Sequence, residues 1–222
     1  MPPGTCPRCK RPARSNGSHS TVHGKKSKWF CRHCWISFSG DYIEDHPTRA
    51  GYFDIEASSL RADFGHVICW CILPERGKIH EDCIRCLSEE EEKRVLQSFL
   101  KAVKSFDILY GYNSSRFDWP FLRTRALHYD LAFPGYGELW THDLYFAIRG
   151  KLSLSRKSLE KVTRFLDIPG KTPLDEKVWQ DAAWGKSEAL PKILRHCEGD
   201  VKILRVVHQK LEPFLRPVRR SI

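Results

Sequence analysis

Gly51-Tyr52-Phe53-Asp54-Ile55-Glu56-Ala57-Ser58 is the stretch of this 222-residue chain that decides its fold. Its aromatic and apolar residues predict a buried β-strand that ends at Ser58-Ser59. Positions i and i+2 of a strand lie on one face, so Asp54 and Glu56 would lie side by side. Two buried carboxylates repel each other unless a cation or a proton lies between them. Because hard divalent cations prefer oxygen ligands, the pair indicates a Mg²⁺ or Mn²⁺ site. A solvent-facing strand edge is the alternative.

The segments that follow predict an α/β arrangement. We expect strands at 66–73 and 78–85, joined by a turn at 74–78 into an antiparallel hairpin. A helix begins at Ser88, which forms a predicted capping box with Glu91. The other expected elements are a strand at 107–113, a helix after Pro120, a strand passing into a helix over 141–149, and helices at 157–166, 174–183 and 189–211. This order of elements predicts a layered α/β sheet.

Two later segments add further acidic side chains. Asp118 lies within Tyr112-Asn113-Ser114-Ser115-Arg116-Phe117-Asp118-Trp119-Pro120-Phe121-Leu122, in the loop before the next helix. A helix N-cap is the alternative role for it. His196 and Asp200 are four positions apart in a helix and therefore share one face. There the carboxylate could bind a metal ion while the imidazole deprotonates a water molecule. A surface His–Asp pair is the alternative.

Taken in this order, the three acidic segments resemble the motifs of the DEDD superfamily of 3′–5′ exonucleases, the DnaQ-like branch of the RNase H-like fold. The resemblance covers about residues 51–212, and Tyr-Asn-x-x-x-Phe-Asp-x-Pro-Phe-Leu is its most specific part. The chain looks most similar to the YprB-type RNase H-like domains, next to the exonuclease domains of family B polymerases. The fold implied for residues 51–222 is an RNase H-like layered fold, a mixed β-sheet with helices on both faces.

The resemblance also implies roles for individual residues. Asp54, Glu56, Asp118 and Asp200 would hold two Mg²⁺ or Mn²⁺ ions, with Asp54 bridging both, and His196 would be the general base. His196 departs from the family pattern, because it stands at the spacing where one subfamily places a tyrosine. Asn113 and Phe117 are predicted to contact nucleic acid, although Asn113 could instead tie its strand end to the next loop. We expect Asp143 to be a helix N-cap or to support the site, rather than to bind metal.

The first forty residues form a separate cysteine-rich module. Cys6-Pro7-Arg8-Cys9 and Cys31-Arg32-His33-Cys34 are two Cys-x₂-Cys knuckles separated by 21 residues. Four thiolates in this layout suit one tetrahedral structural Zn²⁺ ion, which would supply the folding energy that so polar a segment lacks. The module resembles the N-terminal zinc ribbons of insertion-sequence transposases, which implies DNA binding. We therefore expect a zinc ribbon at 1–40 and a linker at 41–50.

Positive charge is concentrated in this module. Residues 1–40 contain eight basic and no acidic residues, and so carry eight of the ten net positive charges. Such a segment predicts a polyanionic partner, for which nucleic acid is the first candidate; a solubilising basic tail is the alternative. We expect Lys25, Lys26, Lys28 and Arg32 to contact phosphates. Trp29 or Trp35 could stack on a base, while at least two of Trp29, Trp35 and Phe38 would fill the small core.

The remaining cysteines have a less specific pattern. Cys69, Cys71, Cys83 and Cys86 could form a second metal site or a redox pair. Buried thiols that act as small apolar residues are the better interpretation.

Composition limits the class of protein. No stretch approaches the ~18 apolar residues of a membrane span, and the first ten residues lack a secretory apolar region. We expect an intracellular protein of the cytoplasm or nucleoid, neither secreted nor membrane-bound. The predicted function is a 3′–5′ exonuclease acting on single-stranded DNA or unpaired 3′ ends. A 3′–5′ exoribonuclease and a non-catalytic nucleic-acid-binding adaptor are the alternatives. We expect no polymerase region in the chain itself, so a polymerase or repair partner would act in trans.

Overall fold

The computed structural model describes residues 4–21, 24–39, 49–135, 138–170, 173–215 and 220–221; the side chains of 18–21, 24–26 and 220–221 are not described. The chain divides into two compact units, Met1–Pro47 and Thr48–Ile222. Each unit is described by itself. The predicted linker at 41–50 lies outside the described residues as far as position 48.

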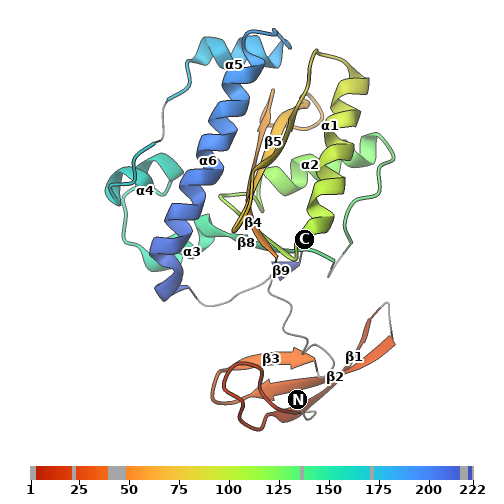
Figure 1. Ribbon diagram of the computed structural model, residues 1–222, viewed down its shortest axis with the longest axis vertical. Helices are drawn as coiled ribbons and strands as arrows, with labels where there is room; N and C mark the ends of the chain where they lie inside the picture. The colour runs from red at the N-terminus through yellow and green to blue at the C-terminus, as the bar shows by residue number, and fades with distance from the viewer. Residues whose placement is uncertain are drawn as a thin grey trace. The chain divides into compact units, whose positions relative to one another are not determined.

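The N-terminal unit contains a three-stranded antiparallel sheet (Figure 1). Its strands are β1 (Arg14–Thr21), β2 (Gly24–Cys31) and β3 (Ile36–Ser39), in the order β1-β2-β3. One Cys-x₂-Cys knuckle precedes β1, and the other begins at the last residue of β2 and continues into the turn before β3. The sheet thereby brings two knuckles together that are far apart in sequence.

The larger unit is built on a mixed sheet that is six-stranded over the described residues, in the order β6-β5-β4-β7-β8-β9. The strands are β4 (Ala50–Ala57), β5 (Val67–Pro74), β6 (His80–Cys83), β7 (Ile108–Gly111), β8 (Trp140–Asp143) and β9 (Arg220–Ser221). The β4–β5 and β5–β6 pairs are antiparallel, as expected for a hairpin, whereas β4–β7 and β7–β8 are parallel. The strand that carries Asp54 and Glu56 is therefore central.

Helices cover both faces of this sheet, which confirms the predicted α/β class. They are α1 (Glu89–Ala102), α2 (Asp118–His128), α3 (Leu144–Lys151), α4 (Leu159–Phe165), α5 (Glu176–Ala183) and α6 (Leu190–Leu211), with short 3₁₀ turns η1 (Val103–Ser105) and η2 (Glu212–Phe214). Figure 1 shows the sheet nearly edge-on, with α6 on one side and α1 and α2 on the other. Within the described residues, every helix is too short or too polar to cross a bilayer.

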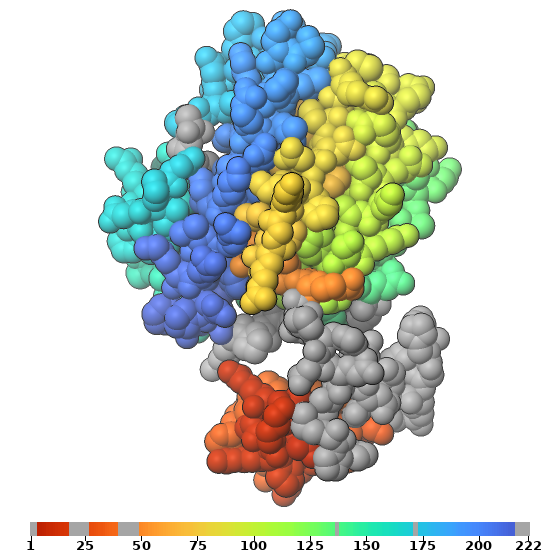
Figure 2. Space-filling view, in the orientation of Figure 1, coloured from red at the N-terminus to blue at the C-terminus, as the bar shows by residue number. Residues whose placement is uncertain are grey.

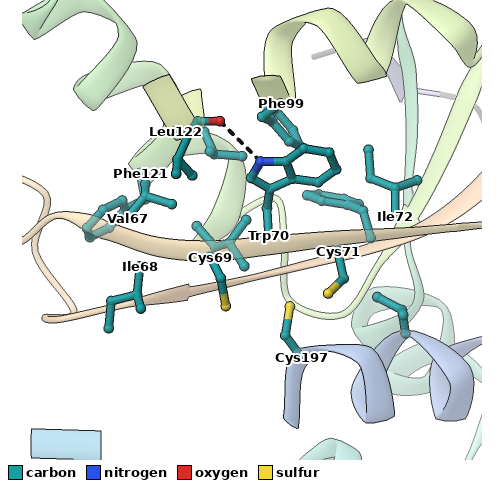
Figure 3. Packing of buried hydrophobic residues seen from close by; sticks show 14 of the residues in the cluster. Val67, Ile68, Cys69, Trp70, Cys71, Ile72, Phe99, Phe121, Leu122 and Cys197 are labelled. Atoms are coloured by element: carbon teal, nitrogen blue, oxygen red, sulfur yellow. Dashed lines mark hydrogen bonds between the residues drawn. The ribbon is translucent and has the colours of Figure 1, made fainter. Parts of the chain in front are cut away.

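Strand β5 shows why the sequences of the central strands are continuous apolar runs. Trp70 points towards α1, where its indole N–H donates to the carbonyl of Val95 at 3.1 Å. Cys69 and Cys71 point to the opposite face, towards Cys197 of α6 (Figure 3). A strand buried on both faces needs apolar residues at successive positions rather than at alternate ones.

The prediction that the cysteines pack as small apolar residues is confirmed for Cys69 and Cys71, which are fully buried in the core. Cys83 packs against the edge of the same core. Cys86 is exposed, so the prediction was wrong there. The exposed position follows from the loop between β6 and α1, in which Cys86 lies.

Two predicted helix starts need correction. Helix α2 begins at Asp118, before Pro120, so Asp118 belongs to the first turn rather than to the preceding loop. Ser88 accepts from the backbone N–H of Glu91 as expected. The Glu91 carboxylate does not complete the capping box, because it pairs with Arg85 and Arg94 instead. Two charge-assisted bonds outcompete one bond to a backbone N–H.

We predict that Gly111→Ala destabilises the protein. A Cβ at Gly111 would overlap Ser114 and lie 2.8 Å from the ring of Phe53. Overpacking of this kind costs about 1–3 kcal/mol, which chemical denaturation would measure. Gly150→Ala is the matched control, because its Cβ meets open space and alanine favours the helix by about 0.5–1 kcal/mol. Equal stability changes for the two variants would contradict the prediction.

Candidate active site

A pocket of about 400 Å³ lies where β4, the loop after β7 and α6 meet. It is lined by Asp54, Ile55, Glu56, Leu60, Tyr112, Asn113, Phe117, Asp118, Trp179, His196 and Asp200. All seven residues that the sequence singled out in this unit as catalytic or nucleic-acid-binding are among them. The structure thus gathers side chains from three distant segments around one opening.

Strand lengths explain how Asp118 reaches β4. Strand β4 runs to Ala57, but its parallel partner β7 ends at Gly111, so their pairing stops at Tyr52. Beyond that point the β7-facing edge of β4 has no ladder partner. The Asp118 carboxylate occupies this edge and accepts the backbone N–H of Ile55 at 3.2 Å. The early end of β7 therefore makes room for the Asp118 carboxylate at Ile55, the residue between Asp54 and Glu56 in sequence.

Helix α6 supplies the third part of the pocket. The Cys197 thiol donates to the backbone carbonyl of Asp54 at 3.4 Å, which fixes the helix against β4. His196 and Asp200 lie one turn apart, with Nε2 and Oδ2 3.9 Å from each other, and each side chain is 14% exposed. They line the pocket rather than forming a surface pair.

Glu56 places a buried carboxylate at the pocket. It is only 6% exposed, and within the described part of the chain no hydrogen bond reaches its carboxylate. Burial raises the pKa of Glu56 well above its usual value, and the nearby negative charge of Asp54 adds to the effect. Because an ionised carboxylate without a partner is costly to bury, this site requires a cation or a bound proton.

Asp118 adds to the same excess of negative charge. Burial raises its pKa to about 7, against the lowering effect of the backbone N–H groups of Asp118 and Ile55. Among the described residues, the ligand atoms of Asp54, Glu56 and Cys197 all lie within 4.8 Å of one another, and those of Asp118 and Asp200 do not belong to that group. Buried oxygen ligands in excess, without lysine or arginine in the pocket lining, fit a hard divalent cation.

Asp143 organises the loop between β7 and α2. Its side chain accepts from the backbone N–H of Asn113 at 2.8 Å and from the N–H and hydroxyl of Ser115 at 2.9 and 2.6 Å. It also caps α3 through the N–H of Tyr145 at 3.0 Å. Asn113 itself has a positive φ of 58°, which asparagine tolerates better than most residues. The prediction that Asp143 caps a helix is confirmed, and its backbone bonds tie Asn113 to the neighbouring strand.

Several pocket residues escaped sequence reasoning. Leu60 is 83% exposed at the rim, and Trp179 of α5 packs edge-on against His196 at 6.0 Å between ring centroids. Cys197 lies between His196 and Asp200 in sequence, but as an apolar helix position it gave no sign of contact with β4. In the sequence, the one hint of these residues was an apolar Leu60 placed directly after the predicted strand end at Ser58-Ser59.

The four cysteines of the N-terminal unit also converge. The Sγ atoms of Cys6, Cys9, Cys31 and Cys34 lie within 4.8 Å of one another, compared with about 3.8 Å between sulfurs around tetrahedral zinc. The backbone N–H of Cys34 donates to the sulfur of Cys31 at 3.4 Å. This donor set and spacing suit a thiolate-bound metal.

The predicted phosphate contacts of this unit are placed only in part. Lys28 and Arg32 are exposed, whereas Lys25 and Lys26 lie on β2 with side chains outside the described set. Of the candidate stacking residues, Trp29 is half-buried against Gly4, while Trp35 is 80% exposed.

Known proteins resemble parts of this chain. DNA polymerase 2 of Aeropyrum pernix is 29% identical over 155 residues, which cover 57% of this chain and 18% of that protein. A DNA polymerase of Archaeoglobus fulgidus is 42% identical over 43 residues, covering 18% and 6%. The DNA polymerase beta of an African swine fever virus isolate is 28% identical over 126 residues, covering 50% and 10%. The chain thus spans less than a fifth of each relative.

A solved structure and a family model place the fold. The family B DNA polymerase from Pyrobaculum calidifontis superposes with a TM-score of 0.64 at 21% identity, over 91% of this chain and 28% of that one. The RNase_H superfamily model matches residues 51–212, a range that contains the whole pocket. The chain therefore belongs to the RNase H superfamily.

Proposed function

We propose that the chain is a divalent-metal-dependent 3′–5′ exonuclease that acts on single-stranded DNA or unpaired 3′ ends. One observation carries the proposal: Asp54, Glu56, Asp118, His196 and Asp200 line one pocket in a member of a superfamily of nucleic-acid-processing folds. A binding-only protein gains nothing from clustered carboxylates facing a polyanion. The relatives' names favour DNA over RNA, because they are DNA polymerases.

The carboxylates are assigned to hold the metal ions. Asp54, Glu56 and Asp200 would hold one ion, and Asp54 with Asp118 a second. Ions in such a site activate a water molecule and stabilise charge on the leaving oxygen. The protein's own contribution is to keep the four carboxylates rigid, through the β4 backbone, the Ile55–Asp118 bond and the contact of α6 with β4.

His196 is assigned as the general base. Its imidazole lines the pocket beside Asp200 and would accept a proton from the attacking water. Trp179 packs against the edge of the ring and limits its rotation. A base held in one orientation near the reacting oxygen is what proton transfer requires.

The rest of the pocket wall would receive the end of the strand. Phe117 and the exposed Leu60 offer apolar surfaces for an unpaired base, and the Asn113 side chain offers an amide. These groups suit a frayed or single-stranded end, because a base within a duplex hides its faces by stacking.

The N-terminal unit is proposed to bind one zinc ion through Cys6, Cys9, Cys31 and Cys34, and to add affinity for nucleic acid. Its clustered sulfurs support the first part, and its lack of acidic residues over 1–40 supports the second. The chain would then combine a positively charged binding unit with an acidic cleavage pocket.

Asp54→Asn tests the proposed activity. With Mn²⁺ present, we expect wild-type protein to release mononucleotides from a 3′-labelled DNA oligonucleotide and to shorten a 5′-labelled one stepwise. The variant should lose about a thousandfold or more in rate, roughly 4 kcal/mol, because it removes a carboxylate oxygen that would hold the metal ions. Asp130→Asn is the control, since Asp130 is exposed and outside the pocket lining.

The same assay separates the alternatives. Preferred digestion of a matched RNA strand would replace the DNA assignment with an exoribonuclease. Internal cuts in both labelled strands would indicate an endonuclease. Wild-type rates in Asp54→Asn would refute catalysis at this pocket.

Glu56→Gln tests the metal fit without measuring cleavage. In buffer freed of divalent ions, the folded-state pKa of Glu56 is raised. Its stability contribution is therefore fully present at pH below the ordinary glutamate pKa of 4.5 and is lost as pH rises through the raised folded-state pKa. We expect Glu56→Gln to raise Tm at pH 8 by at least about 2 °C, or roughly 1 kcal/mol, with a smaller gain at pH 5.

Added Mn²⁺ should then raise the Tm of wild-type protein and leave that of Glu56→Gln nearly unchanged. Glu188→Gln, at an exposed glutamate, is the control and should behave as wild type in both conditions. A lower Tm for Glu56→Gln without divalent ions would show that the carboxylate is already satisfied within the protein.

Zinc content checks the cysteine cluster. We expect about one zinc per chain by elemental analysis of purified protein, and none in Cys31→Ser/Cys34→Ser, because removing two of four thiolates abolishes a tetrahedral site. Cys83→Ser/Cys86→Ser is the matched control and should keep the wild-type zinc content. Loss of zinc in the control alone would move the site to the larger unit.

A further inference from the structure

A second pocket lies within the N-terminal unit. It has a volume of about 520 Å³ and is lined by Arg14, Ser15, Asn16, Phe30, Arg32 and Trp35. The sequence predicted contacts for only two of these residues, Arg32 and Trp35, and none for the other four. The lining combines two guanidinium groups, two aromatic rings and one amide.

The exposure of Trp35 is the first sign of a ligand. Its side chain is 80% exposed, although a tryptophan that only filled the core would be buried. Its backbone has a positive φ of 54°, which is a strained conformation for a bulky residue. The Trp35 ring makes an edge-to-face contact with Phe30, at 5.7 Å between ring centroids and 83° between planes. This contact orients the indole.

Trp29 provides the contrast within the same sheet. It precedes Phe30 on β2 and therefore points to the opposite face. There its ring packs so closely on Gly4 that a Cβ at this glycine would come within 2.8 Å. One tryptophan thus contributes to the small core, while Trp35 offers an open aromatic face of the kind on which unpaired bases stack.

Arg14 and Arg32 line the pocket together with the aromatic pair. Arg14 is directly opposite Phe30 in the β1–β2 register, and Arg32 directly follows β2. Both are exposed. Residues 1–40 contain no Asp or Glu, so no carboxylate of this segment can neutralise either guanidinium. Arg11, by contrast, is engaged with His33 at 2.9 Å.

We propose that this pocket, the Trp35 pocket, binds one nucleotide unit of a single nucleic-acid strand. The base stacks on Trp35, and the Asn16 amide hydrogen-bonds the polar edge of the base. Arg14 and Arg32 contact the flanking phosphates. The inference rests on the proposed function in taking an unpaired strand as the ligand. It deepens that function by placing strand recognition at Arg14, Arg32 and Trp35 of the N-terminal unit.

Binding of a fluorescent 12-residue oligothymidylate tests the pocket. The assay uses the full chain carrying Asp54→Asn, without added divalent ions, and reads fluorescence anisotropy. Adding Trp35→Ala should weaken binding about tenfold, the effect of losing one stacked base, whereas Trp35→Phe should keep most of the affinity. Trp184→Ala, which removes a 73% exposed tryptophan of the other unit, should have no effect.

The salt dependence of the same binding tests the arginines. Arg14→Gln/Arg32→Gln should reduce the slope of log affinity against log salt by about 1.4, since each phosphate contact on a single strand contributes about 0.7. Arg8→Gln/Lys10→Gln removes the same charge from exposed positions outside the pocket and should change the slope less. Unaltered circular dichroism and Tm would show that each variant is folded.

Three further ligands decide between explanations. An abasic oligonucleotide should bind wild type and Trp35→Ala alike, and a blunt duplex should be insensitive to Trp35. Trp35-dependent binding of poly-glutamate as tight as that of the oligonucleotide would overturn the proposal in favour of an acidic protein partner. Full affinity in Trp35→Ala for oligothymidylate would also overturn it.

Cleavage by the wild-type chain is scored separately. Trp35-dependent binding without any cleavage would leave the pocket standing and remove the proposed nuclease. Cleavage together with Trp35-independent binding would support the proposed nuclease and overturn the Trp35 pocket.

Discussion

The carboxylates of Asp54 and Glu56 are carried on β4, which pairs with β5 along its length and with β7 only as far as Tyr52, in a sheet covered by helices on both faces. Glu56 is buried there and Asp54 is half-buried, so their mutual repulsion has to be compensated locally. Burial already raises the pKa of Glu56, and Asp118, brought to the same strand, adds further negative charge. A central β-strand that carries acids inward is stable when cations neutralise those acids.

The surrounding structure serves to hold those acids in place. Because β7 is shorter than β4, the Ile55 N–H is free to bind Asp118. Asp143 then fixes the intervening loop through backbone bonds at Asn113 and Ser115 while it caps α3. On the other face, Cys197 contacts the backbone of Asp54. Each of these groups positions a carboxylate or its loop without needing to contact a substrate.

Charge divides the chain into two kinds of surface. The N-terminal unit is basic over its first forty residues and presents an open indole beside two arginines. The larger unit has 29 basic and 24 acidic residues over 48–222, and four of its acids line one pocket. Such a division suits a protein that attracts a polyanion with one surface and reserves the repulsive acidic site for metal-assisted chemistry.

The sequence by itself determined what depends on local periodicity and spacing. The buried run at 51–58, the hairpin of β5 and β6, the amphipathic helix α6 and the two Cys-x₂-Cys knuckles are all patterns within a few residues of one another, and the structure has each element there. The resemblance to exonuclease motifs selected the carboxylates that line the pocket.

Tertiary structure decided whatever depends on where one element ends against another. The end of β7 sets the bond between Ile55 and Asp118, the proximity of Arg85 and Arg94 diverts Glu91 from its cap, and the packing of Gly4 separates Trp29 from the open Trp35. These outcomes arise from contacts between residues distant in sequence, and no periodicity in either segment encodes which partner will be near.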